Sequence, residues 1–375
     1  MELGLLPALG SGVADLRRSG QDARLFDGYI RPYARAFDRV WYFSYLVETL
    51  GQYTDDPDVL STVGLLAPRR PRPRLVRALT LPLTDAAAIR RCAVLRVFQV
   101  TGVVPALVAR ALWAIPYVTT YGFWYSSLSH SRSSRLAKRA LERVALRCAA
   151  AVIVPTEDLR AHVSRVVPAT RVHLIPNGVD IARFAPRAVA RADGPRILYV
   201  GRLSAEKNLG TAIAAAAKLS RRWPLRLTFI GAGPLESELR CLAAQACVTA
   251  DFPGVLDHRR LPARYQDADV FVLPSFTEGH PKVLLEAMAS GLPCVASDCT
   301  GNRSLLTDGE TGLLFDPGDA DALASRLERL FADPAFARRL GERGRARVAA
   351  EYDLGRLVER EIGLLRRVAS VRIPA

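Results

Sequence analysis

The chain has 375 residues, 50% of them hydrophobic and 24% charged, which suits two domains that each bury a core. Its six cysteines form no Cys-x-x-Cys pair and its five histidines are dispersed, so we expect buried thiols in a reducing compartment and no zinc-type cluster. The net charge of +15 is uneven, since residues 1–190 carry +12 and residues 191–375 carry +3. A basic first half suits nucleic acid, anionic lipid or an acidic acceptor, and equally suits solvated charge without a partner.

The first predicted strand, residues 3–9, is followed by a glycine loop and a helix over residues 13–19. Gly10 and Gly12 in this loop would let the backbone approach a ligand closely. A tight strand-to-helix turn explains the same two glycines without any ligand. Further elements of the first half are strands over residues 39–45, 94–99 and 116–120 and a helix over residues 105–113. This alternation predicts an α/β fold with a parallel sheet covered by helices on both faces.

Two segments of the first half bear on membranes. The most apolar span, residues 101–121, is interrupted by two prolines and an arginine, whereas a membrane-spanning helix needs ~20 apolar residues in a row. A basic, proline-broken loop is predicted over residues 67–77, and a helix over residues 131–150 carries a basic stripe. The stripe consists of Arg132, Arg135, Arg139 and Arg143. It predicts either peripheral contact with an anionic membrane or a solvated helix face.

No positively charged leader precedes an apolar run at the start of the sequence, so no signal peptide is expected. We therefore predict a cytoplasmic protein, at most peripheral at the inner face of the membrane. Residues 180–195 are rich in proline and charge without a clear period, which predicts an interdomain linker. A strand over residues 196–200 then begins a second strand-helix series, and residues 354–370 predict a final helix.

The most informative stretch is residues 271–291, in which two glutamates are separated by seven residues. It predicts a buried parallel strand, a loop from residue 274 and a helix from residue 283. Glu278 therefore lies at the carboxyl end of a strand, where open α/β sheets bind ligands, and Glu286 lies inside the helix. Two carboxylates so placed can bind different hydroxyls of one elongated ligand. The backbone N–H groups between them favour an anion such as a phosphate.

This stretch resembles the glutamate pair of the family-4 glycosyltransferases, which have the GT-B fold. The segment Gly201–Leu209, just after a predicted strand, is similar to the family's strand-loop-helix that carries an arginine and a lysine. Further matches follow in order at residues 175–180, 229–234, 252–255 and 302–319. The resemblance is dense from about residue 148 to about residue 330 and thin upstream.

The resemblance implies two Rossmann-like domains that face each other across a cleft. Residues 1–185 would form the acceptor-binding domain and residues 190–350 the domain that binds a nucleotide-sugar donor. Residues 351–375 would form a helix that crosses back to the first domain.

The resemblance also assigns roles to individual residues. Arg202 and Lys207 would bind the donor diphosphate, whose developing charge needs cations when no metal is present. Glu278 would bind a hydroxyl of the donor sugar and completes the predicted catalytic set. Glu286 would bind the ribose hydroxyls. The other predicted donor-binding residues are Gly201, Val255, Gly279, His280, Pro281, Lys282 and Val283.

Two positions depart from a simple match. Tyr121 stands where the family commonly has a histidine. It is either a hydrogen-bond donor on the acceptor side or a packing residue. Gly10 and Gly12 are the other residues predicted on the acceptor side. Asp267 and Asp269 match an Asp-x-Asp pattern that holds metal in other glycosyltransferases, but they directly precede a buried strand. We therefore predict no metal and no cofactor.

The leading interpretation is a retaining, metal-independent glycosyltransferase that acts by same-face attack on a nucleotide sugar. The acceptor stays open among glycans, lipid-linked sugars and small molecules. One alternative is an epimerase-type enzyme of the same fold, which would turn over the donor alone. The other is a basic nucleic-acid-binding protein, against which stands the lack of a recognition motif; no nucleic acid is expected as partner.

Overall fold

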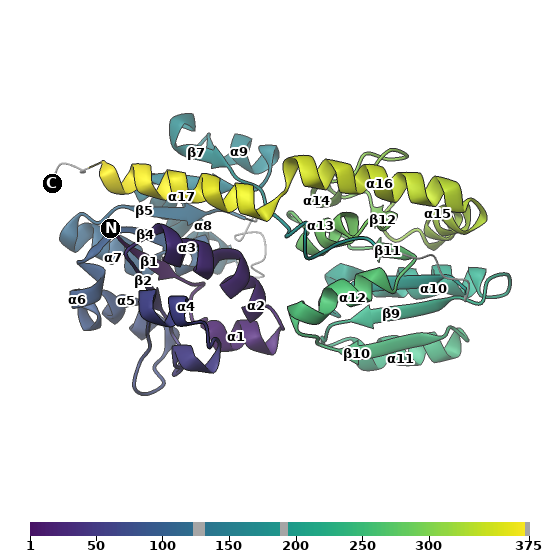
Figure 1. Cartoon of the computed structure of the whole chain (residues 1–375), viewed down its shortest axis with the longest axis horizontal. Coiled ribbons are helices and arrows are strands. Elements are labelled where there is room, and N and C mark those ends of the chain that lie inside the picture. The colour runs from purple at the N-terminus through teal and green to yellow at the C-terminus, as the bar shows by residue number, and fades with distance from the viewer. Residues whose placement is uncertain (123–131, 188–193, 372–375) are drawn as a thin grey trace. The chain divides into compact units, whose positions relative to one another are not determined.

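The computed structural model describes residues 1–122, 132–187 and 194–371. The chain forms two compact units, each of which is described by itself (Figure 1). Unit 1 comprises Met1–Pro176 and Leu357–Ala375, and unit 2 comprises Asn177–Arg356. The division at Pro176 lies upstream of the sequence-based boundary at 185–190. Residues 188–193 of the predicted linker lie outside the described residues.

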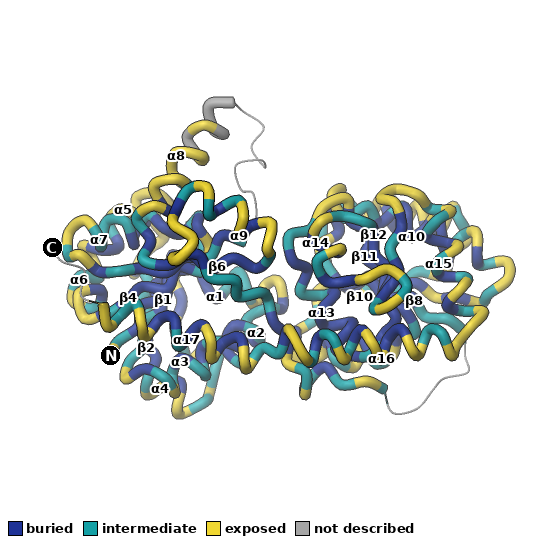
Figure 2. Tube along the Cα trace, turned by 90° about the horizontal axis from the view of Figure 1, so that it is seen from above, coloured by how far each residue is buried: buried dark blue, intermediate teal, exposed yellow. Residues whose placement is uncertain are grey.

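Unit 1 is built on a seven-stranded parallel sheet with the order β3-β2-β1-β4-β5-β6-β7. The strands are β1 (Glu2–Leu6), β2 (Arg39–Phe43), β3 (Val63–Leu66), β4 (Cys92–Val97), β5 (Tyr117–Thr120), β6 (Ala151–Val154) and β7 (Val172–Leu174). Most residues of the central strands β1, β4, β5 and β6 are buried, as expected of a parallel sheet between two layers of helices, whereas the edge strands β3 and β7 are mostly half-buried (Figure 2).

The helices of unit 1 are α1 (Val13–Arg18), α2 (Asp22–Leu25), α3 (Arg31–Ala36), α4 (Pro57–Thr62), α5 (Arg74–Thr84), α6 (Ala86–Ile89), α7 (Val104–Trp113), α8 (Arg132–Cys148), α9 (Glu157–Val163) and α17 (Leu354–Ser370). α17 returns from the far end of the sequence and lies along unit 1, where its Glu361 contacts Arg96 of β4 and Tyr33 of α3. The resemblance implied a crossing helix over residues 351–375; α17 begins at Leu354, and its residues from Leu357 onward belong to unit 1.

One expectation for unit 1 is wrong in part. The basic loop predicted over residues 67–77 ends at Pro73, and α5 begins at Arg74. Pro71 and Pro73 break the segment before Arg74, whereas the leucine-rich residues that follow complete helical turns and accommodate Pro82 inside α5.

Unit 2 is a six-stranded parallel sheet with the order β10-β9-β8-β11-β12-β13. Its strands are β8 (Arg196–Val200), β9 (Arg226–Ile230), β10 (Ala250–Gly254), β11 (Val270–Leu273), β12 (Cys294–Ser297) and β13 (Leu313–Phe315). Its helices are α10 (Leu209–Leu219), α11 (Glu236–Gln245), α12 (Leu261–Gln266), α13 (Lys282–Ala289), α14 (Thr300–Arg303), α15 (Ala320–Ala332) and α16 (Pro334–Glu351).

The strand order of each unit reverses next to its first strand. In unit 2 the reversal lies between β8 and β11, and in unit 1 between β1 and β4. Open parallel sheets bind ligands at such switch points, beyond the carboxyl ends of the strands. The loops that follow β8 and β11 carry the motifs singled out from the sequence.

Candidate functional site

An ion pair joins the two loops at the switch point of unit 2. Lys207, in the loop after β8, lies with its Nζ 2.7 Å from Oε1 of Glu278, in the loop after β11. Both side chains keep some exposure, 20% for Lys207 and 11% for Glu278. The structure therefore brings together a cation and a carboxylate that are 71 residues apart in the sequence.

Glu278 is held in place by its surroundings. The Ser275 hydroxyl donates a hydrogen bond of 2.7 Å to the same carboxylate oxygen that contacts Lys207. α14 packs directly on the Glu278 backbone, because a Cβ built on Gly301 would lie 2.4 Å from the Glu278 carbonyl oxygen. Only glycine permits this approach, so the position of Glu278 depends on a residue after β12.

Arg202 follows β8 and is exposed. Its guanidinium has no ion-pair or hydrogen-bond partner among the described residues. Its backbone is fixed, since the Tyr199 hydroxyl donates to the Arg202 carbonyl at 2.9 Å. The neighbouring Gly201 packs against Gly231, where a Cβ would lie 1.9 Å from the Gly201 carbonyl oxygen. The loop thus combines a rigid backbone with an exposed cationic side chain. The Ser204 hydroxyl, and to a smaller extent the charge of Arg202, lowers the pKa of Glu206.

Glu286 lies on α13 and is 1% exposed. The Nε2 atom of His258 lies 2.9 Å from its Oε1, and the Tyr265 hydroxyl donates to its Oε2 at 3.0 Å. His258 belongs to the segment after β10, and Tyr265 to α12. The carboxylate is therefore positioned from two elements that follow the edge strand of the sheet.

His280 lies in the same loop as Glu278 and is 7% exposed. Burial lowers the pKa of His280 to about 4, together with a smaller contribution from the nearby charge of Lys282. Its ring packs on Tyr352 at a centroid distance of 5.5 Å, and its carbonyl accepts a hydrogen bond of 2.8 Å from the Asn177 side chain. His280 is therefore a neutral residue that anchors the loop before α13.

Gly279, Pro281, Lys282 and Val283 complete the loop and the start of α13, with Pro281 buried and the other three half-buried. Val255 directly follows β10 and is 42% exposed. It precedes His258 by three residues, so it lies on the segment that supplies a contact to Glu286.

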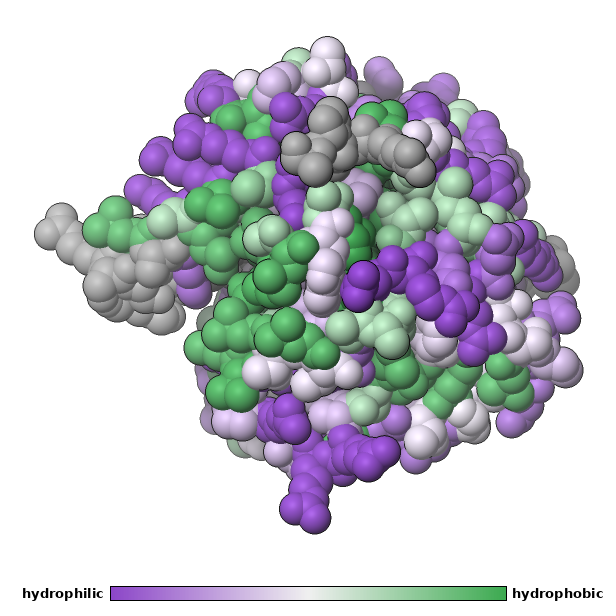
Figure 3. All heavy atoms as spheres, turned by 90° about the vertical axis from the view of Figure 1, so that its left-hand side faces the viewer, coloured by the Kyte–Doolittle hydropathy of each residue, from purple (hydrophilic) through white to green (hydrophobic). Residues whose placement is uncertain are grey.

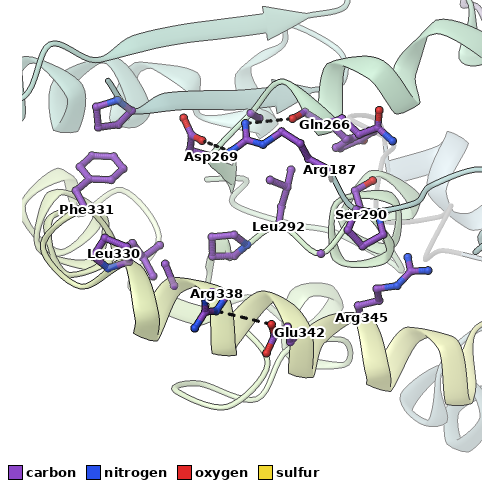
Figure 4. A pocket seen from close by; sticks show the side chains of 18 of the residues that line it. Arg187, Gln266, Asp269, Ser290, Leu292, Leu330, Phe331, Arg338, Glu342 and Arg345 are labelled. Atoms are coloured by element: carbon purple, nitrogen blue, oxygen red, sulfur yellow. Dashed lines mark hydrogen bonds and ion pairs between the residues drawn. The ribbon is translucent and has the colours of Figure 1, made fainter. Parts of the chain in front are cut away.

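A cavity of 720 Å³ lies at the opposite, amino end of β11 and β12 (Figure 4). Two of its arginines are paired within the cavity wall, Arg187 with Asp269 at 3.1 Å and Arg338 with Glu342 at 3.9 Å. Asp269 also accepts a hydrogen bond of 3.0 Å from the Arg196 backbone. The second aspartate of the Asp-x-Asp pattern is thus engaged in structural contacts, at the other end of β11 from Glu278.

The glycine loop of unit 1 encloses a carboxylate of the chain itself. Gly10 has a φ of +80°, a conformation that favours glycine, and a Cβ on Gly12 would lie 2.6 Å from Glu48 Oε1. The Glu48 carboxylate accepts hydrogen bonds from the backbone of Val13 at 2.9 Å and of Ala14 at 2.8 Å. The first N–H groups of α1 are therefore already satisfied.

Tyr121 is 1% exposed, and its ring stacks on His162 at 5.9 Å with an interplanar angle of 17°. This geometry is that of a packing residue at the end of β5. Among the helices of the described residues, none is long and apolar enough to cross a membrane.

Two family models account for most of the sequence. The model described as glycosyl transferases group 1 matches residues 181–347, and the model described as glycosyltransferase family 4 matches residues 17–183. The chain belongs to the family-4, group-1 glycosyltransferases.

The chain is also similar to solved structures and to curated relatives. The sucrose-phosphate synthase from Thermosynechococcus elongatus superposes with a TM-score of 0.81 at 25% identity, over 98% of this chain and 99% of that one. The fold is therefore the GT-B fold that the sequence predicted. The α-D-kanosaminyltransferase of Streptomyces kanamyceticus is 33% identical over 242 residues, 60% of this chain and 63% of the relative.

A third relative is the GDP-mannose-dependent α-(1-6)-phosphatidylinositol monomannoside mannosyltransferase of Mycolicibacterium smegmatis. It is 32% identical over 229 residues, 56% of this chain and 60% of the relative. The matches cover between about one third and two thirds of the length of the curated relatives.

The structure thus brings Lys207 and Glu278 into contact and places Arg202 on the same loop as Lys207. Sequence reasoning missed the partners of Glu286, which are His258 and Tyr265. It also missed Glu48, which lies beyond a strand with no motif around it. A buried carboxylate needs hydrogen-bond donors, and this need is what could have pointed to such partners. The sequence alone does not show that the carboxylate is buried.

Proposed function

We propose that this protein is a retaining glycosyltransferase that moves a sugar from a nucleoside diphosphate sugar to a hydroxyl of an acceptor. The observation that carries the proposal is the Lys207–Glu278 pair at the switch point of unit 2, next to the unpaired guanidinium of Arg202. Family membership supports the same reading. The kanosaminyl- and mannosyltransferase relatives are named as transferases, and the latter as dependent on GDP-mannose.

Arg202 and Lys207 would bind the diphosphate. Lysine presents three N–H donors, so Lys207 can keep one on Glu278 and direct the others at a phosphate oxygen. Arg202 can bind two oxygens at once. Negative charge grows on the diphosphate as its bond to the sugar breaks, and these two cations stabilise that charge without rearrangement. In this scheme no metal is required.

The two glutamates would bind hydroxyls at the two ends of the donor. The Lys207 and Ser275 contacts of Glu278 both fall on its Oε1, and a sugar hydroxyl can donate to its Oε2. A carboxylate offers about four acceptor positions. His258 and Tyr265 orient the Glu286 carboxylate, which would bind the ribose hydroxyls.

Transfer would proceed by attack of the acceptor hydroxyl on the same face from which the diphosphate departs. The departing phosphate oxygen takes the acceptor proton, so the protein supplies charge stabilisation and orientation rather than a nucleophile. The acceptor class stays open among glycans, lipid-linked sugars and small molecules, with unit 1 as its binding domain. The basic charge of the first half supports contact between unit 1 and an anionic membrane.

Calorimetric titration with UDP, GDP and ADP and with their sugars tests the proposal. We expect one nucleotide to bind, and the Lys207→Ala variant to lose transfer by about 100-fold or more, as removal of a transition-state donor does elsewhere. Lys218→Ala is the matched control, because Lys218 is a lysine of the same unit whose partner is the exposed Asp321. This control should retain wild-type binding and transfer.

Nuclear magnetic resonance of the product then reports the anomeric configuration, and retention is expected. An inverted product, or activity that a chelator abolishes and magnesium restores, would contradict the mechanism. Turnover of the donor without an acceptor would indicate an epimerase-type enzyme instead. Absence of binding to every nucleotide would overturn the proposed function itself.

A further inference from the structure

α5 presents an apolar face to solvent. Leu75, Leu79 and Leu83 recur at intervals of four residues and are 58%, 56% and 62% exposed, with Val76 beside them at 48%. The opposite face of the helix is packed on unit 1, where Leu81 is fully buried. Exposed leucines on soluble proteins are usually scattered singly. Four large apolar side chains on one face of one helix mark an interaction surface.

The apolar surface extends beyond this helix. α7 packs against α5, and its Leu112 is 52% exposed. Figure 3 looks onto the side of unit 1 that carries α5, α6 and α7 in Figure 1, and hydrophobic side chains gather there in a continuous area bordered by hydrophilic ones. We name these residues the α5 patch: Leu75, Val76, Leu79, Leu83 and Leu112.

The charge that flanks the α5 patch in the sequence is mainly positive. Four exposed arginines immediately precede or begin α5, namely Arg69, Arg70, Arg72 and Arg74. Between Asp58 and Glu142 the sequence has 13 arginines and lysines and a single acidic residue, Asp85. That aspartate forms an ion pair of 2.8 Å with the buried Arg77. The patch therefore combines exposed leucines with cations that have almost no acidic neighbours in sequence.

We propose that the α5 patch docks unit 1 on an anionic phospholipid bilayer. α5 lies in the plane of the interface, its leucines enter the boundary between headgroups and acyl chains, and Arg69 to Arg74 bind the headgroup phosphates. A second copy of this chain would place two basic surfaces against each other, which is unfavourable. Nucleic acid would neutralise the arginines but would leave the leucines in water.

The docking surface lies next to the glycine loop of unit 1. A Cβ built on Gly10 would lie 3.1 Å from the Cβ of Arg74, so the basic start of α5 contacts the loop between β1 and α1. A membrane bound by the α5 patch would therefore lie beside the loop that we assigned to the acceptor side. The docking proposal itself does not depend on the proposed function, since the donor residues belong to unit 2.

Flotation of the full-length protein with lipid vesicles tests the proposal. Wild type should float with vesicles that contain phosphatidylglycerol and much less with phosphatidylcholine alone, and added salt should release it. The Leu79→Asp/Leu83→Asp variant should lose binding by about tenfold or more. Each of Arg70→Gln and Arg72→Gln should weaken binding by about fivefold.

Leu60→Asp is the matched control, because Leu60 is a leucine on α4 of the same unit, 44% exposed and close to Asp58. It should float as wild type does. Thermal unfolding shows whether each variant is folded, and Leu79→Ala/Leu83→Ala gives a milder change if the aspartates perturb α5. The proposal is overturned if wild type does not float with phosphatidylglycerol vesicles, or if the leucine variants bind these vesicles as strongly as wild type does. It is also overturned if wild type binds nucleic acid and not vesicles.

Discussion

His280 is a buried histidine of the candidate site, and its protonation state affects the charge of that site. It lies in the loop between Glu278 and α13, and burial lowers the pKa of its imidazole to about 4. At neutral pH it therefore adds no positive charge to the site. In the proposed function, the positive charge for a diphosphate would then come from Arg202 and Lys207 and not from His280. The role that fits His280 is to hold the loop through its contacts with Tyr352 and Asn177.

The lowered pKa of His280 predicts an acid-sensitive fold. The unfolded chain binds a proton on this residue below about pH 6.5, whereas the folded protein does so only below about 4, so stability falls as the pH drops between these values. The loss should reach about 2 kcal/mol at about pH 5. Urea unfolding at about pH 7 and about pH 5 measures it, and His280→Gln should lose less than wild type. Equal losses in both proteins would show that His280 does not carry this effect.

At the scale of elements, α17 is fixed to unit 1 by a buried polar cluster. Glu361 of α17 forms an ion pair with Arg96 of β4, and both side chains are about 5% exposed or less. The Tyr33 hydroxyl donates to the same carboxylate at 2.5 Å, and Arg96 also donates to Thr120 at 2.8 Å. The cluster joins residues from four separate elements. The cluster contributes to the stability of the fold mainly because it leaves no buried charge without a counter-charge, and less through the attraction between its charges.

Replacing Glu361 by Gln should therefore destabilise the protein. The change leaves the Arg96 guanidinium buried without a counter-charge, which costs about 3–5 kcal/mol in comparable pairs. Glu359→Gln is the control, because Glu359 lies on the same helix but is exposed. Thermal unfolding of the two variants should show a clear drop in Tm for the first and almost none for the second. Similar Tm values would mean that the cluster is not a stabilising contact.

The helices and strands that the sequence predicts correctly are those with a clear local pattern. The helix expected over residues 354–370 has the observed bounds of α17, because a long amphipathic pattern defines it locally. β3 was missed, since four residues that include Gly64 carry too little pattern. Lys207, Glu278 and Glu286 were singled out because each lies in a short motif that resembles one of the family. His258 and Tyr265 were not, because they lie 28 and 21 residues from Glu286 and only the fold brings them close.

At the scale of the whole molecule, the two units differ in how the chain forms them. Unit 2 is one continuous segment, whereas unit 1 needs both Met1–Pro176 and α17. The ends of the unit 2 segment are tied together, since the backbone of Val179 donates to the Tyr352 carbonyl at 3.0 Å. Val179 and Tyr352 both belong to its hydrophobic core. Unit 2 therefore has what an independent folding unit requires.

We expect the isolated segment Asn177–Arg356 to fold and to bind the same nucleotide as the full chain, with an affinity within about tenfold, because the proposed donor residues all lie in it. It should have no transfer activity, since unit 1 is missing.

A chain that ends at Arg356 should have a less stable unit 1, because it lacks most of α17 and leaves Arg96 unpaired. Calorimetry of that chain should show unit 1 unfolding at a lower temperature than unit 2. An unfolded Asn177–Arg356 segment, or one transition at the temperature of the intact chain, would show that the stability of each unit depends on more than its own core.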